Sequence, residues 1–135
     1  MKKILTLAAA ALLLLPAASA QENQKINKKN LVIKEWNTDA RSNARSLDHQ
    51  TTYNADGKKI DEIEYGSKGQ KWRKRYEYGA NGKVARELVY DERNKLHSVK
   101  KFEYNEFGRK KTQYTYDRKG KLITIKVFEY ITEDA

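Results

Sequence analysis

The 135-residue chain contains no cysteine and only two histidines, His49 and His97. Without cysteine, the chain has neither disulfides nor a thiol nucleophile, and its stability must come from packing and hydrogen bonds. Hydrophobic residues make up 39% of the chain and charged residues 34%, which predicts a thin core.

Residues that could support catalysis are also scarce. Strand parity places the two histidines on opposite faces, which does not favour a shared metal or a dyad. The glycines are spread along the chain rather than clustered before a helix, as a phosphate-binding loop requires. Acids such as Asp61, Glu62 and Glu64 have lysine neighbours and are interpreted as cross-strand ion-pair partners. We therefore expect no enzyme, no metal site and no cofactor.

Only one long apolar run is present, at residues 4–15. It follows two lysines and precedes the small residues 18–20, an order typical of a secretory signal peptide, and it is too short to span a bilayer. We expect cleavage between Ala20 and Gln21, with no transmembrane segment in the mature chain. No cysteine follows the run, so a lipid anchor on a cleaved N-terminal cysteine is excluded. The expected location is the periplasm or the extracellular space.

The rest of the chain is a repeat. Its clearest copy, Tyr116 to Leu122, has an aromatic residue, a small polar residue, two variable residues, glycine, a base and leucine. A first degraded copy begins at Trp36, and Tyr130 begins a last one. The other copies begin at tyrosines spaced 12 to 14 residues apart, namely Tyr53, Tyr65, Tyr78, Tyr90 and Tyr104. This period fits one strand plus one turn, so it predicts an all-β antiparallel meander of seven or eight strands in a single sheet, open or strongly curled.

Each copy is expected to form a turn with a left-handed residue and an adjacent bulge. Asparagine tolerates positive φ better than other non-glycine residues, so Asn94 suits this position. The first copy has Ala40 there, which predicts another geometry within the polar connection 39–46. The structural turn positions are therefore Gly57, Gly69, Gly82, Asn94, Gly108 and Gly120.

Three segments follow from this reading: a signal peptide at residues 1–20, a flexible N-terminal arm at 21–30, and one meander domain at 31–135. Strand parity then assigns the leading tyrosines to a single face. The 13-residue spacing after Tyr65 breaks this parity once, which predicts a bulge within residues 71–74. The opposite face is mostly charged, except that the last strand carries Ile123, Ile125 and Val127 there; the strand at 31–36 is expected to cover it.

The motif at Tyr116–Leu122 closely resembles the YD repeat of Rhs-type and teneurin-type proteins, and the other copies match it more loosely. The likeness covers roughly residues 36–130. The whole also resembles small secreted bacterial proteins of unknown function built from a few such units. The resemblance implies a β-sheet fold in which the motif residues form turns and packing contacts. Carbohydrate binding has been ascribed to some members of the family, so the resemblance indicates little about the function of this chain.

The favoured function is a secreted, non-catalytic binding or structural module. Bases alternate with aromatic residues along the expected tyrosine face, a pattern that suits an anionic polymer such as a polysaccharide. The candidate ligand-binding residues are Trp72, Tyr76, Arg86, Lys100, Tyr114 and Lys126. Nucleic acid is disfavoured, because an exported protein meets little of it. Two other interpretations stay open: the tyrosines form the core and the lysines only solubilise, or an exposed edge strand docks an envelope protein, as in an accessory or inhibitor protein.

Overall fold

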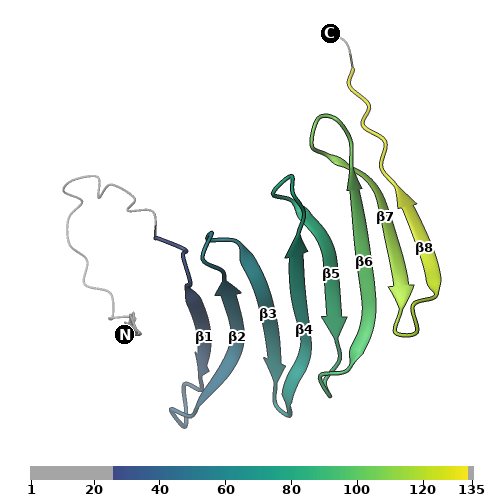
Figure 1. Ribbon diagram of the computed structural model, residues 1–135. Coiled ribbons are helices and arrows are strands. Elements are labelled where there is room, and N and C mark those ends of the chain that lie inside the picture. The colour runs from purple at the N-terminus through teal and green to yellow at the C-terminus, as the bar shows by residue number, and fades with distance from the viewer. Residues whose placement is uncertain (1–25, 134–135) are drawn as a thin grey trace, which may run out of the picture.

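The computed structural model describes residues 26–133, which form one antiparallel sheet in a single layer (Figure 1). The strands are β1 (Val32–Thr38), β2 (Arg45–Tyr53), β3 (Lys59–Gly66), β4 (Gly69–Tyr78), β5 (Val84–Tyr90), β6 (Leu96–Tyr104), β7 (Lys110–Asp117) and β8 (Leu122–Val127). They lie in the sheet in the order of the sequence. The predicted open meander is therefore confirmed, with eight strands.

The expected signal peptide lies outside the described residues, and the described part has no helix suited to crossing a membrane.

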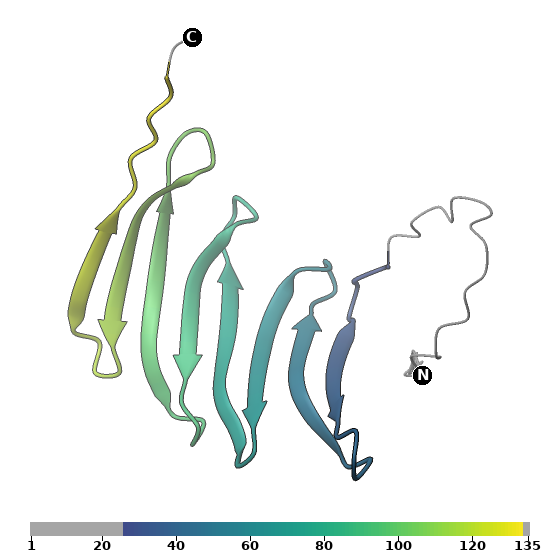
Figure 2. The same ribbon diagram turned by 180° about the vertical axis from the view of Figure 1, so that it is seen from behind.

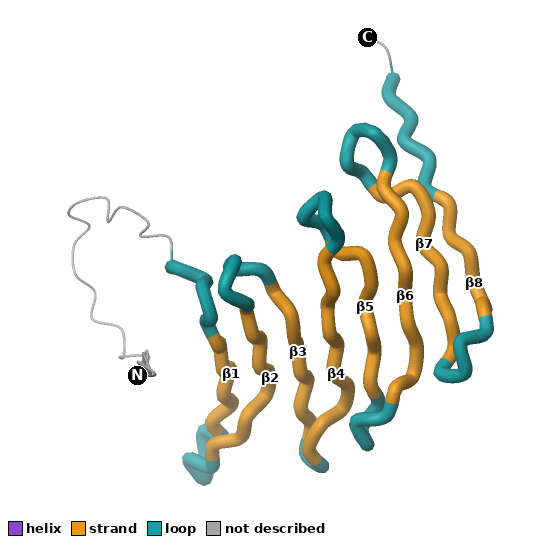
Figure 3. The backbone as a smooth tube through the Cα atoms, viewed as in Figure 1, coloured by secondary structure: helices purple, strands orange, loops and turns teal. Residues whose placement is uncertain are grey.

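The hairpin ends form two sets of turns, one at each end of the strands (Figure 3). Five turns share one geometry, in which the first residue donates its N–H to the fifth residue's carbonyl and accepts from the fourth residue's N–H. In the turn that begins at Asp117, the carboxylate also accepts from the backbone N–H groups of Lys119 and Lys121, at 2.9 Å each. These bonds explain the Asn or Asp that follows four of the leading tyrosines, because Asn and Asp side chains satisfy turn N–H groups.

The predicted left-handed positions are confirmed. Gly120 has a φ of 83° and Asn94 one of 59°, and the other four positions have positive φ as well: Gly57, Gly69, Gly82 and Gly108. The turn between β1 and β2 differs, as expected: Asp39 accepts from the N–H of Asn43, the residue with a φ of 58°.

The register shifts once in every hairpin of the sheet, which marks a bulge in each. In the hairpin of β3 and β4, Tyr65 pairs with Gln70 but Glu64 pairs with Trp72, so Lys71 is the extra residue. This lies within the predicted segment 71–74. However, the other hairpins between β2 and β8 also contain a register shift, and in each of them it lies next to the leading tyrosine. The prediction that parity breaks only once is therefore wrong.

The core is thinner than the composition suggested. Among the described residues no hydrophobic side chain is buried, and the buried polar residues are Thr51 and Thr112, each 8% exposed. The apolar side of β8 is open, with Ile125 54% and Val127 68% exposed. The expected cover by residues 31–36 is wrong, because β1 pairs with β2 and lies at the opposite end of the sheet from β8 (Figures 1 and 2).

Candidate functional site

The six candidate ligand-binding residues lie on both faces of the sheet rather than on one. Directly paired residues of neighbouring strands point to the same side, and successive residues of a strand alternate. Tyr76 pairs with Glu87 and Glu87 with Lys100, which places Tyr76 and Lys100 on one side. Trp72 and Lys126 share that side by the same reasoning. His49 lies on the same side, because it pairs with Glu64 and Glu64 pairs with Trp72. We therefore name this side the histidine face.

The other two candidates lie on the opposite side. Arg86 pairs with Lys101 and Lys101 with Tyr114, so Arg86 and Tyr114 share a face that also carries Arg73. We name it the arginine face. The single tyrosine face predicted from the spacing is therefore wrong, and the sheet does not bring the six candidates together.

Two arginines on the arginine face have acidic partners. Arg86 donates to both carboxylate oxygens of Glu77, at 2.7 and 3.0 Å, and the hydrogen bond from Arg86 lowers the pKa of Glu77. Arg73 donates to Asp61, whose side chain is only 14% exposed. Of the three basic candidates Arg86, Lys100 and Lys126, the ion pair with Glu77 thus neutralises Arg86.

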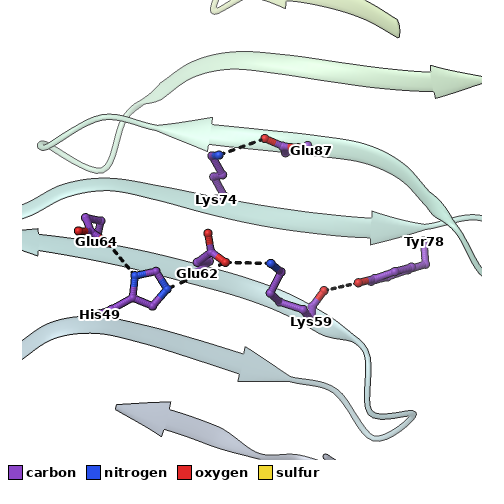
Figure 4. A network of polar contacts seen from close by, with 7 residues as sticks. All are labelled: His49, Lys59, Glu62, Glu64, Lys74, Tyr78 and Glu87. Atoms are coloured by element: carbon purple, nitrogen blue, oxygen red, sulfur yellow. Dashed lines mark hydrogen bonds and ion pairs between the residues drawn. The ribbon is translucent and has the colours of Figure 1, made fainter. Parts of the chain in front are cut away.

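The histidine face carries charges of both signs in its middle (Figure 4). The Nδ1 atom of His49 lies 2.7 Å from a carboxylate oxygen of Glu64, and Lys59 donates to Glu62 at 2.9 Å. Lys74 lies 3.7 Å from Glu87, the residue paired with Lys100. Burial lowers the pKa of Lys59, but its contacts with Glu62 and Tyr76 outweigh burial and raise it overall. From β2 to β5 this face is therefore a network of ion pairs, whereas none of the ion pairs among the described residues includes the candidates Lys100 and Lys126.

A different set of bases gathers at one end of the hairpins, the end formed by the turns β2–β3, β4–β5 and β6–β7. Each of these bases lies over the ring of a tyrosine two strands further along, at 5.1 to 5.7 Å from its centroid. We name this set the cation–tyrosine row; its pairs are Lys58 with Tyr78, Lys83 with Tyr104, and Arg109 with Tyr130. Lys28 extends it, lying 5.5 Å from the ring of Tyr53.

The repeat itself builds this row. Each base is the residue after a turn glycine, and each tyrosine leads a later copy. The tyrosine hydroxyl donates to the carbonyl of the residue after the base, as when Tyr104 donates to Val84 at 2.7 Å. A β-carbon at Gly108 would lie 3.0 Å from Cε of Lys83, so glycine at this turn also leaves room for the base of the previous turn at the same end of the sheet, the β4–β5 turn.

The row keeps its positive charge. None of the ion pairs found among residues 26–133 includes Lys58, Lys83 or Arg109. Burial raises the pKa of Tyr78, so its phenol stays neutral at ordinary pH. Successive bases are two strands apart, and since strands lie about 4.8 Å apart, they recur roughly every 10 Å.

Sequence reasoning missed this row because it compared neighbouring copies. Alternate turns lie at the same end of a meander, so the informative comparison is between copies two apart. The signal was present as a base after glycine followed by tyrosine 20 or 21 residues later, as with Lys58 and Tyr78 or Lys83 and Tyr104. At the other end the equivalent of Lys58 is Gln70, which donates to the carbonyl of Asp91 at 2.8 Å.

Within residues 26–133, no three His, Cys, Asp or Glu side chains are grouped so that they could hold a metal ion. Searches against protein-family models and against curated proteins found no match for this chain.

Proposed function

We propose that the protein is an exported, non-catalytic binding module that holds an extended anionic polymer, such as an acidic envelope glycan, along the cation–tyrosine row. The observation that carries the proposal is the regular spacing of Lys58, Lys83 and Arg109 at one end of the sheet, with no acidic partner for any of them among the described residues. Export rests on the signal-peptide pattern at residues 1–20.

The contacts within the row favour an anion as ligand. Each base is held over an aromatic ring, which restricts its side chain without neutralising it. Lys83 and Arg109 are exposed, so carboxylate, sulfate or phosphate groups can reach them. Tyr130 is 46% exposed and offers part of its ring for stacking on a sugar.

The repetition of the row favours a polymer over a small molecule. A small anion needs several donors converging on one point, whereas these bases are separated by roughly 10 Å along a line. A polymer with charges along its length can contact Lys58, Lys83 and Arg109 together, and the individual weak contacts then add through effective concentration.

The test compares two triple variants with equal loss of charge. Lys58→Gln, Lys83→Gln and Arg109→Gln remove the row; Lys68→Gln, Lys95→Gln and Lys119→Gln remove exposed bases from turns at the opposite end. Binding of the exported protein to heparin and to a neutral glucan is measured over a range of salt concentrations.

The native protein should bind heparin and not the glucan, with an affinity that falls as salt rises. The row variant should lose most of this affinity, and its slope of log affinity against log salt should decrease by about 2 to 3, as counterion release for three contacts predicts. The opposite-end variant should bind nearly as the native protein does. Equal losses in both variants would show that net charge alone attracts the polymer and would refute the proposed site.

A further inference from the structure

The two edge strands, β1 and β8, are complementary to each other. Among residues 26–133, neither has a neighbouring strand on its outer side, and both expose apolar residues: Val32 47% and Ile33 38% on β1, Ile125 54% and Val127 68% on β8. Edges of this kind attract further strands, and proteins usually protect them with charges, prolines or coverage. β8 carries a single charged residue, Lys126.

The even number of strands makes these edges compatible in direction. Strands alternate along the meander, so β1 and the eighth strand run oppositely. If β8 of one copy lies beside β1 of a second copy in the same orientation, the new pair is antiparallel and the alternation of the sheet continues. With an odd number of strands, the first and last strands would run in the same direction, and the same arrangement of two copies would give a parallel pair.

Backbone hydrogen-bonding groups also match. Phe128 donates its N–H to Lys111 of β7, and antiparallel residues alternate in direction, so the backbone groups of Ile125 and Val127 point away from β7. On β1, Leu31 accepts from Tyr53 of β2, so the groups of Val32 and Lys34 point away from β2. Outward groups therefore meet outward groups when Val127 pairs with Val32.

Side chains agree with this register. It pairs Ile125 with the aliphatic stem of Lys34 and Val127 with Val32 on the arginine face. On the histidine face Lys126 lies opposite Ile33, with Glu35 as its diagonal neighbour, a favourable pair of opposite charges. The register extends no further than Glu35, because β1 has its own bulge between Glu35 and Trp36.

We propose that copies of this chain associate edge to edge, β8 of one copy against β1 of the next, into an open row of sheets. The occupant of each edge is a second copy, because direction, backbone and charge match between the two edges of one molecule. Such a head-to-tail contact leaves an unpaired edge at each end of a pair, so further copies can add and the assembly can lengthen. This inference is independent of the polymer-binding proposal.

The first test measures molar mass by light scattering over a range of protein concentrations. The native protein should increase steadily in mass with concentration beyond a dimer. Ile125→Lys places a charge on the β8 edge and should return the protein to a monomer. Ile131→Lys is the matched control, since Ile131 is 86% exposed and lies outside β8; it should assemble as the native protein does. A native protein that stays monomeric at all concentrations overturns the proposal.

The second test uses the absence of cysteine. Ile33→Cys and Lys126→Cys are made in separate proteins, because this pair would be non-hydrogen-bonded, the type in which side chains approach most closely. An oxidised mixture should give a disulfide dimer containing one of each. Crosslinking of the Lys126→Cys protein with itself as efficiently as in the mixture would indicate a symmetric β8–β8 contact and overturn the head-to-tail arrangement.

Discussion

Gly120 is the fourth residue of the turn between β7 and β8, with a φ of 83°. A β-carbon built there would meet no atom within 4 Å, so Gly120→Ala tests backbone conformation alone. A left-handed L-residue costs roughly 1–2 kcal/mol, and the stiffer unfolded chain returns roughly 0.4–1 kcal/mol of this. We expect Gly120→Ala to lower the free energy of unfolding by about 1 kcal/mol.

Gly120→Asn is the matched variant, because Asn94 occupies the same turn position at a φ of 59°. Its cost should be less than about half that of alanine, since asparagine tolerates this region. Urea unfolding followed by the fluorescence of Trp36 and Trp72 measures both. Equal costs for the two variants, or an alanine variant as stable as the native protein, would refute the argument that backbone conformation determines the residue here.

Two further predictions concern the tyrosines of the row. Tyr104→Phe keeps the ring beneath Lys83 but removes the hydroxyl that donates to Val84, and should cost about 0.5–1.5 kcal/mol in urea unfolding; no change would mean that this bond is not stabilising. Burial raises the pKa of Tyr78 and of Tyr104, so the folded state favours their neutral phenols. This stabilisation is complete below the ordinary pKa of about 10 and is lost as pH rises through the raised values, so the urea midpoint should fall above about pH 10. A constant midpoint there would contradict it.

The turns could be predicted from sequence because their chemistry is local. A carboxylate at Asp117 bonds to N–H groups two and four residues later, and Gly120 supplies the left-handed residue. All the interacting groups lie within five consecutive residues, 117–121. The strand number follows from the same information, since each turn separates two strands.

The faces could not be predicted in this way, because side-chain direction depends on pairing across the hairpin. Tyr53 pairs with Lys59, yet Thr52 pairs with Asp61, so the bulge changes the parity between β2 and β3. In the hairpin of β3 and β4 the two-residue turn changes parity once and the bulge changes it back. Counting by twos therefore assigned Arg86 and Lys100 to one face, when a bulge between their strands separates them.

The sequence repeats with every strand and turn, whereas the contacts of the cation–tyrosine row join copies that are two repeats apart. One copy supplies a strand and a turn, but the next turn lies at the opposite end of the sheet. Lys58 consequently contacts Tyr78 and the carbonyl of Gly82, which belong to the copy two positions later. Each contact spans about two strands and lies at the end of the histidine face, since Tyr78 follows Tyr76 by two residues in β4. In a sheet without a buried hydrophobic residue among those described, these end contacts link successive hairpins directly. The bases of the row are therefore part of the packing, and a ligand that contacts them meets side chains already held in place.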